Sequence, residues 1–409
     1  MNPTFTVTVT DTIGGYSSYL TPIKENALVA ARDWGQFITG SGQIDIQINI
    51  KDSAGIADGA STYTDYTWST FEGRRAVEVT YGSFTEIMTG TDPNGATSDI
   101  TINIEKDYLH TNAGGLWFDS NPYDQTHVVP TNLLDSLLVL THEIGHGFGF
   151  SGFRNTSTGI LNEYVASDGL SYPYFTSYDS YVTMSGGNAY FNGSTAKSAY
   201  GAAVPLTSAI LHPISGVYHF GNSTGVGADL YSKGVMHPTT SNGQSLDLSI
   251  LDLSILKDLG YNVSFDDNIF RFFNRSTGTH FYTANIDEKN NVKTNLSNFN
   301  YEGVAFQTEA TAQTGHAVYR FYNTTLDSHF YTISDYERDF VRQNLSNYQY
   351  ESQVFYAYEN NSSGDHEALY RFFNTATGTH FYTASVVERD SVVANLPSFK
   401  YEGIGFYIE

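Results

Sequence analysis

The sequence predicts an α+β domain over residues 1–265, followed by a β-rich domain over residues 266–409. Two observations support this division. The first part alternates stretches of helical and strand periodicity, whereas the second part repeats one aromatic pattern three times. A chain of 409 residues is long enough for two or three domains. We place the boundary near residues 262–267, between the last predicted helix and the first repeat.

In the first domain, periodicity predicts a helix followed by two strands. Residues 21–38 carry apolar side chains at helical spacing, Trp34 among them. Residues 43–50 and 99–104 alternate apolar and polar side chains, as half-buried strands do. We therefore expect the helix to pack on a sheet that contains these strands.

Two further helices are predicted in this domain. Residues 131–147 form an apolar helical run after Pro130 and end in glycines, and residues 246–259 form another that stops at Gly260. Residues 152–216 lie between them and are rich in Gly, Ser and Tyr, with little periodicity. Such a composition predicts irregular structure.

The second domain repeats its own sequence. The motif Arg-Phe-aromatic-Asn begins at residues 271, 320 and 371, and the motif His-Phe-Tyr-Thr begins at residues 280, 329 and 380. Each unit is expected to contain short aromatic strands, a short polar helix around Glu288, Glu337 or Glu388, and a further strand. Three such units predict a pseudo-threefold β-rich domain, for which a β-trefoil is one closed form.

Composition excludes several functional classes. Acidic residues outnumber basic residues 43 to 20, which gives a formal net charge of -23. We therefore expect no nucleic-acid partner, because phosphate binding needs clustered Lys and Arg. The chain has no cysteine, which excludes disulfides, thiolate metal sites and a cysteine nucleophile. No apolar run is long enough to predict a membrane span.

The same composition suggests where the protein works. An acidic chain rich in Gly, Ser, Thr and Asn is typical of secreted, extracellular proteins, and we expect secretion. Because oxidising compartments favour disulfides, a secreted chain without cysteine suggests a bacterial source. The first residues show neither a basic region nor an apolar segment, so no signal peptide is visible in this chain.

The motif His142-Glu143-Ile-Gly-His146 lies near the end of the apolar helix predicted over residues 131–147. Histidines four residues apart lie on one face of a helix, so both imidazoles can bind one metal ion. Glu143 is placed to accept a proton from a water molecule that the metal activates. This pattern on a helix is typical of zinc peptidases, the zincins.

A catalytic zinc ion needs a third protein ligand and an open position. In the metzincins a glycine ends the helix, and the third histidine follows it by three residues. Gly149 matches that glycine, but Gly152 stands where the histidine would be. The candidates that remain in the sequence are Glu163, His212, His219 and His237.

Two downstream segments favour His219 among these candidates. Tyr218-His219-Phe220 is followed by Val235-Met236-His237-Pro238. Over about residues 20–262 the chain resembles the leishmanolysin-like branch of the metzincins, in which a long insertion precedes the third histidine. Pro238 departs from those metzincins that have a tyrosine two residues after the turn methionine.

The resemblance implies a metzincin-like fold, with a twisted sheet and an active-site helix. It implies a Zn²⁺ site made by His142, His146 and His219, with Glu143 as general base and Met236 in a methionine turn beneath the metal. It also implies that the strand at residues 99–104 is the edge along which a peptide substrate docks. An ordinary core strand is the alternative at that place.

The function implied is that of a secreted zinc metalloendopeptidase acting on protein or peptide substrates. Two alternatives remain open at this point. One is a protease directed at glycoproteins or mucins by its repeats, and the other is a non-catalytic adhesin or lectin with a vestigial zinc site. The presence of Glu143 favours an enzyme.

The repeats resemble a module appended to secreted bacterial hydrolases, which implies a carbohydrate-binding or surface-binding role. The recurring histidines are candidates for sugar contacts, although the favoured explanation is that the repeated residues form the shared core and buried structural bonds. A weaker expectation is Ca²⁺ binding by loop aspartates, because carboxylates in Gly- and Asn-containing loops suit that ion. The candidate aspartates are Asp52, Asp58, Asp92, Asp119 and Asp124.

Overall fold

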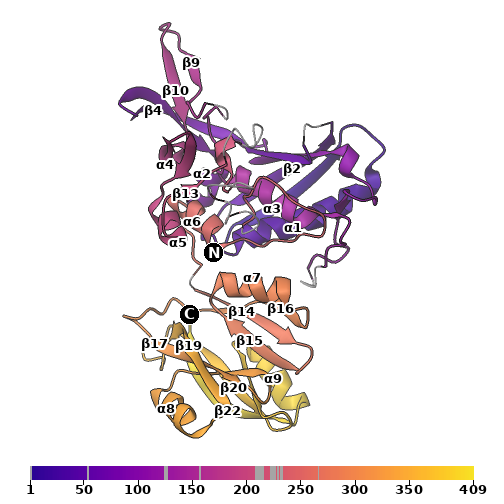
Figure 1. Cartoon of the computed structure of the whole chain (residues 1–409), viewed down its shortest axis with the longest axis vertical. Coiled ribbons are helices and arrows are strands. Elements are labelled where there is room, and N and C mark those ends of the chain that lie inside the picture. Colours follow the sequence, from indigo (N-terminus) through magenta and orange to yellow (C-terminus); the bar gives the residue numbers. More distant parts are fainter. Residues whose placement is uncertain are drawn as a thin grey trace. The chain divides into compact units, whose positions relative to one another are not determined.

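The computed structural model contains two compact units, of which unit 1 ends at Val263 and unit 2 comprises Ser264–Glu409. It describes residues 2–52, 55–123, 128–155, 158–207, 216–221, 227, 230, 234–265 and 267–409. Unit 1 mixes helices and strands, and unit 2 is β-rich (Figure 1). Across the described residues, every helix is too short or too polar to span a lipid bilayer.

The central sheet of unit 1 has the strand order β1-β2-β6-β3. Its strands are β1 (Thr4–Asp11), β2 (Gln43–Lys51), β6 (Ile100–Glu105) and β3 (Ala57–Ser61). The first three are parallel, and β3 runs antiparallel to β6. Every second residue of β2 is a buried isoleucine, which confirms the alternation that predicted this strand.

Two helices of unit 1 pack against each other and against this sheet: α1 (Leu20–Gly35) and α3 (Ser136–Gly147). The Trp34 indole N–H of α1 donates to the backbone carbonyl of Thr141 in α3 over 2.9 Å. Both groups are buried, and a buried indole N–H needs such a partner. The bond therefore joins the two helices inside the core.

The edge strand differs from our expectation. The predicted edge, residues 99–104, corresponds to β6, which pairs with β2 on one side and with β3 on the other. This is the core strand that was the alternative. The edge strands are β1 and β3, and β3 is a Gly- and Ala-containing strand whose alternation is too weak to predict.

Residues 152–216 are more regular than predicted. Within their described part they form the strands β9 (Glu163–Val165), β10 (Ser171–Phe175), β11 (Val182–Ser185), β12 (Asn188–Phe191) and β13 (Val204–Pro205), with the helices α4 (Ser177–Tyr181) and α5 (Ser194–Tyr200). These elements are too short for a clear period. The prediction of irregular structure was therefore wrong.

Two predicted helices begin later than their apolar patterns. Helix α3 begins at Ser136 because the Asp135 carboxylate accepts the Leu137 N–H, while Leu134–Asp135 pairs as β8 with β7 (Leu116–Trp117). Helix α6 (Ile250–Asp258) begins after Ser249, which forms a capping box with Asp252. In both cases a capping side chain, rather than the apolar run, sets the start.

The remaining elements of unit 1 surround this core. They are β4 (Tyr63–Phe71), β5 (Arg74–Tyr81), α2 (Gly82–Thr89) and the short 3₁₀ helices η1 (Ser17–Tyr19), η2 (Lys106–Tyr108) and η3 (Gly216–Tyr218). Strands β4 and β5 form a second sheet with β10 and β9.

Unit 2 consists of three sheets with identical strand order, each with one helix. The first is β14 (Asn268–Asn274), β15 (Thr279–Thr283), α7 (Ile286–Asn295) and β16 (Phe299–Gln307). The second is β17 (His316–Asn323), β18 (Ser328–Thr332), α8 (Asp335–Asn344) and β19 (Tyr348–Ala357). The third is β20 (Glu367–Asn374), β21 (Thr379–Thr383), α9 (Val386–Asn395) and β22 (Phe399–Ile408). This order of elements is the one that the repeated sequence predicts.

Three buried tyrosines join the three repeats of unit 2. The Tyr282 hydroxyl donates to the backbone carbonyl of Tyr382, that of Tyr331 to Tyr282, and that of Tyr382 to Tyr331, each over 2.7 Å. The bonds form a closed cycle, so each repeat contributes one equivalent tyrosine to a shared centre. The finer prediction of a β-trefoil stays a prediction.

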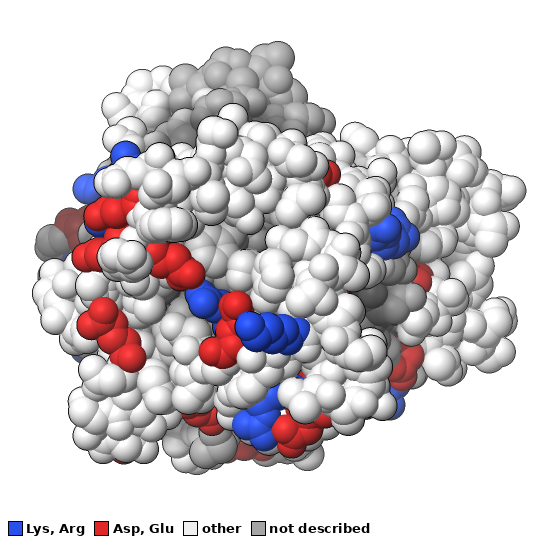
Figure 2. Space-filling view, turned by 90° about the horizontal axis from the view of Figure 1, so that it is seen from below, with Lys and Arg blue, Asp and Glu red and all other residues white. Residues whose placement is uncertain are grey.

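The recurring Arg, His and Glu side chains also link neighbouring repeats. Arg320 binds Glu288 of the preceding repeat over 2.8 Å and Glu351 of its own repeat over 2.6 Å, and the same pattern holds around Arg271 and Arg371. The His329 ring lies 3.5 Å from Glu351. In the view of Figure 2, acidic and basic side chains lie side by side on a largely uncharged surface. These contacts favour the structural interpretation of the recurring residues.

Candidate metal centre

Helix α3 carries the two histidines of the motif on its last turns. Residues 137–140 of this helix are apolar and buried, so this part of the helix lies in the core. His142 and His146 line a cavity. The helix is followed by Gly149 at φ 109°, a backbone conformation that favours glycine. At this turn the chain changes direction and brings the Phe150 carbonyl close to His146, whose Nδ1–H it accepts over 2.7 Å.

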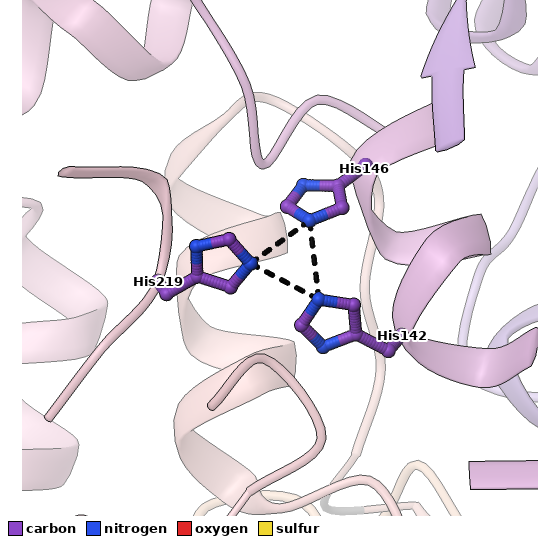
Figure 3. A group of neighbouring side chains, drawn as sticks. All are labelled: His142, His146 and His219. Atoms are coloured by element: carbon purple, nitrogen blue, oxygen red, sulfur yellow. Dashed lines mark hydrogen bonds between the residues drawn. The ribbon is translucent and has the colours of Figure 1, made fainter. Parts of the chain in front are cut away.

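The three histidines favoured by the sequence meet at one point (Figure 3). The Nε2 atoms of His142 and His146 are 3.2 Å apart, and His219 Nε2 lies 3.0 Å from the first and 3.1 Å from the second. Two rings come from α3, and the third comes from the segment that follows η3. Residues distant in sequence thus present one nitrogen each to a common centre.

The tautomers of two of these rings follow from their other nitrogens. His142 Nδ1 lies 2.7 Å from the Val235 carbonyl, and His146 Nδ1 lies at the same distance from the Phe150 carbonyl. A carbonyl only accepts, so both Nδ1 atoms carry the proton and both Nε2 atoms carry a lone pair. Two such lone pairs repel each other, and a cation between them removes the repulsion.

Burial keeps these imidazoles neutral, which is the form that binds metal. Desolvation, with the neighbouring His146, lowers the pKa of His142 to about 3. Desolvation also lowers the pKa of His146. Metal binding requires unprotonated imidazole, so the pocket holds its ligands in the competent state.

Backbone bonds on both sides position His219. The Thr207 N–H donates to the His219 carbonyl over 2.8 Å, and the Phe220 N–H donates to the Met236 carbonyl over 3.2 Å. The backbone around His219 is therefore hydrogen-bonded to the segment that contains Met236.

The other described candidate ligands do not join this cluster, although His237 lines the same cavity. Glu163 forms an exposed ion pair with Arg74 over 2.7 Å, and the His237 Nδ1 atom lies 3.3 Å from the Thr239 N–H. Neither belongs to the group that His142, His146 and His219 form. His212 lies outside the described residues.

The structure explains the glycine at position 152. A Cβ atom there would overlap the Asp179 carboxylate, whose Cγ would be only 2.6 Å away. Asp179 is fully buried and caps α4, while its carboxylate also accepts the Phe153 N–H. A side chain at residue 152 would displace this buried carboxylate, which explains why a glycine stands there.

Glu143 lines the same cavity, which has a volume of about 580 Å³. Its side chain is 7% exposed, and burial, with the negative charge of Asp58, raises its pKa to about 8. Strand β3 packs directly beside α3, with Gly59 against the Glu143 backbone, and it lines the cavity with Asp58 and Gly59. A carboxylate, three imidazoles and an edge strand therefore share one cleft.

Met236 packs against Gly145 of α3 and is fully buried. A Cβ atom on Gly145 would overlap the Met236 sulfur, so the glycine between the two motif histidines makes room for it. The Asp252 carboxylate accepts the N–H groups of both Val235 and Met236 over 3.2 Å. Asp252 of α6 therefore fixes the backbone of this turn, and Gly145 leaves space for the Met236 side chain.

Our reading of the sequence missed three contributors to this site: Asp252, Asp179 and β3. A local signal existed for both aspartates, because Ser249 precedes Asp252 and Thr176 precedes Asp179 by three residues, as in a capping box. The interactions of Asp179 and β3 depend on tertiary contacts across the chain.

The calcium candidates do not gather at one place. Asp52 pairs with Lys106 over 2.7 Å, Asp58 accepts the Asn103 amide over 2.6 Å, and Asp119 accepts the Asn121 N–H over 2.9 Å. Asp124 lies outside the described residues. Only Asp92 joins other carboxylates in the described part of the chain.

Comparisons with known proteins concern unit 2 alone. Residues 268–409 match the model of a family described as a domain of unknown function, DUF5648. No curated protein and no solved structure matches the chain. The match spans the three repeats and does not extend to the histidine cluster.

Proposed function

We propose that unit 1 is a secreted, metzincin-like zinc endopeptidase whose metal ligands are His142, His146 and His219. The observation that carries the proposal is the convergence of three imidazole Nε2 atoms beside the buried carboxylate of Glu143. Support for the fold comes from the sheet, the helix α3 and the buried methionine that packs against Gly145 of this helix.

The donor set fits zinc. Two imidazole nitrogens bound to one zinc ion at about 2.0–2.1 Å and a tetrahedral angle lie about 3.3 Å apart. The three Nε2 atoms are 3.0 to 3.2 Å apart, so small ring movements suffice. Three neutral nitrogen ligands with an adjacent cavity are typical of a catalytic rather than a structural zinc site.

The residues of the cleft then have separate tasks. Zinc, when bound, supplies Lewis acidity that polarises a peptide carbonyl and acidifies water. Glu143 accepts the proton of the attacking water at a carboxylate oxygen and delivers it to the leaving amine. An extended substrate adds to the free edge of β3, which aligns its scissile bond with the cleft.

Hydrolysis of casein by the whole chain tests this function, with Glu143→Gln as the diagnostic variant. Removal of a general base should slow the reaction about a hundredfold or more, while the zinc content stays unchanged. Glu163→Gln is the matched control, because that glutamate is paired with Arg74 outside the cavity. Equal rates for wild type and Glu143→Gln would refute the proposed role of Glu143.

Two narrower outcomes correspond to the alternatives. Cleavage of mucin or another glycoprotein without cleavage of casein would identify a directed protease. Zinc binding without hydrolysis of either substrate would identify an adhesin or lectin with a vestigial metal site.

A specific surface favours carbohydrate binding as a second function, located in unit 2. A groove of about 560 Å³ lies between α8 and β22, and Tyr336 and Phe340 project at its rim with ring centroids 6.5 Å apart. Tyr336 is 80% exposed, and the groove also holds the Glu337–Arg371 pair. Exposed aromatic faces beside charged hydrogen-bonding groups suit a pyranose ring. We propose this groove as the saccharide site.

Binding of the whole chain to mucin-coated, chitin and cellulose beads tests the groove. Tyr336→Ala should abolish retention on whichever bead binds the wild type. Val387→Ala is the matched control, because Val387 is the equivalent residue of the third repeat and is also 80% exposed. Loss of binding in both variants, or retention on none of the beads, would refute the assignment.

A further inference from the structure

A second group of potential metal ligands lies in unit 1, away from the histidines. It consists of Glu86 in α2, Asp92 in the loop after that helix, and Asp99 directly before β6. One carboxylate oxygen of each residue lies within 4.8 Å of the others. Three negatively charged groups therefore meet at the junction of a helix, a loop and the central sheet.

Two of these carboxylates are buried in the core. Asp99 is 2% exposed and Glu86 is 6% exposed, whereas Asp92 faces solvent. Glu86 accepts the Gln43 N–H over 3.0 Å, and Asp99 accepts the Asp45 N–H over 2.8 Å through Oδ2. Both donors belong to β2, so the central sheet fixes the two buried carboxylates in place.

These bonds do not satisfy the group. Asp99 Oδ1 is buried, and no described residue lies within hydrogen-bond distance as its donor. Within the described chain, no Lys, Arg or His forms an ion pair with Glu86, Asp92 or Asp99. A buried carboxylate without a counter-charge is costly, so the group needs either a proton or a cation.

The positions of the ligand atoms favour a cation. A proton shared between Glu86 and Asp99 would relieve the repulsion within that pair. However, it would leave Asp92, whose Oδ1 accepts the Asn94 and Gly95 N–H groups, as a further negative charge beside them. A divalent cation accounts for all three carboxylates and for the unpartnered Asp99 Oδ1. Another neutral oxygen, Asn94 Oδ1 in the same loop, is also buried without a partner. An all-oxygen donor set that includes one solvent-facing ligand is the set that Ca²⁺ prefers.

We propose that Glu86, Asp92 and Asp99 form a structural Ca²⁺ site that joins α2 and its following loop to the central sheet. In a chain without disulfides, such a site supplies a cross-link that packing alone does not. It lies close to the catalytic helix in the fold, because Ser83 of α2 donates to the Gly147 carbonyl at the end of α3 over 2.7 Å. The histidine cluster shares no ligand with it, so the site stands whether or not unit 1 is a peptidase.

Calcium-dependent thermal unfolding of the whole, zinc-loaded chain tests the site. The three tryptophans, at positions 34, 68 and 117, all lie in unit 1, so their fluorescence follows that unit alone. At pH 8, after removal of Ca²⁺ with EGTA, addition of 5 mM CaCl₂ should raise Tm by about 5 °C or more. Metal analysis should find one Ca²⁺ per chain in addition to zinc.

Asp92→Asn is the diagnostic variant, because an exposed aspartate can be neutralised without disturbing the core. We expect it to fold and to lose the Ca²⁺-induced shift. Asp65→Asn, another exposed aspartate of unit 1, should keep the shift. If Ca²⁺ has no effect on the wild type, and if stability falls between pH 5 and pH 8 equally in wild type and Asp92→Asn, a shared proton explains the group and the proposal is wrong. An undiminished Ca²⁺ shift in Asp92→Asn would also overturn it.

Discussion

The carbonyl oxygen of Val235 accepts the Nδ1–H of His142 over 2.7 Å, and this bond fixes which nitrogen of His142 faces the cavity. The Val235 N–H is in turn held by Asp252 of α6 over 3.2 Å. A buried carboxylate thus orients a backbone turn, and the turn orients a proposed metal ligand. Such outer contacts commonly change metal affinity tenfold to a hundredfold when they are lost.

The first prediction concerns Asp252. Asp252→Asn replaces an oxygen that accepts N–H groups of the turn by an NH₂ group, which loosens the turn beneath His142. We expect zinc affinity, measured by chelator competition, to fall at least tenfold. Stability should fall by about 1–3 kcal/mol.

Asp258 provides the control on the same helix. Its carboxylate accepts the Thr195 and Ala196 N–H groups and does not contact the turn. Asp258→Asn should lower stability but leave zinc affinity unchanged. Equal loss of zinc affinity in the two variants would show that general destabilisation, rather than the orientation of His142, is responsible.

The second prediction separates the candidate ligands. His219→Ala should abolish stoichiometric zinc binding, because it removes one of three converging nitrogens. His237→Ala and Glu163→Ala should keep one zinc per chain, since neither residue belongs to the cluster. Metal analysis after dialysis measures all three variants. Zinc retained in His219→Ala and lost in either other variant would assign the third ligand differently.

The local part of the candidate site could be predicted from the sequence. The spacing of His142 and His146 depends only on the helix period, which α3 obeys. His219 could be proposed only through a family resemblance, because its approach depends on how 70 intervening residues fold. Gly152 shows what the sequence alone cannot predict. A side chain there would overlap the buried Asp179, and the sequence around Gly152 does not indicate that contact.

The fold shows the same division. Long strands with strict alternation, such as β2, were predicted within one residue. The edge strand β3 was missed because Gly and Ala give no alternation, and the starts of α3 and α6 were misplaced because single capping side chains set them. In unit 2, sequence repetition itself predicted the order of elements, since three copies of one pattern must adopt one structure.

The third prediction concerns the cycle of tyrosines. The Tyr331 hydroxyl donates to the Tyr282 carbonyl over 2.7 Å and accepts the Tyr282 N–H over 2.8 Å. Tyr331→Phe leaves both buried backbone groups without that partner, so unit 2 should lose about 1–3 kcal/mol of stability. Tyr336→Phe is the control, because that tyrosine is exposed. Hydrogen exchange of peptides from residues 268–409 measures the loss, and similar exchange in both variants would contradict the structural role of the cycle.

The last prediction concerns the pH dependence of unit 2. Desolvation, with the charge of Arg271, lowers the pKa of His280 to about 4, and desolvation with Arg371 does the same for His380. Both rings lie about 3.5 Å or less from a glutamate, which by itself would favour their protonation, but burial and the arginine dominate. In the unfolded chain these histidines titrate near 6.5.

Between pH 6.5 and pH 4 the unfolded chain therefore binds protons that the folded unit excludes. Stability from these residues is fully present above pH 6.5 and is lost as the pH falls toward 4. Hydrogen exchange in β15 and β21 should accordingly become faster from pH 7 to pH 5, after correction for the intrinsic rate. The double variant His280→Gln/His380→Gln cannot take up these protons, so its exchange should depend less on pH. An unchanged pH dependence in this variant would show that other groups, such as the glutamates of the ion pairs, control the acid sensitivity of unit 2.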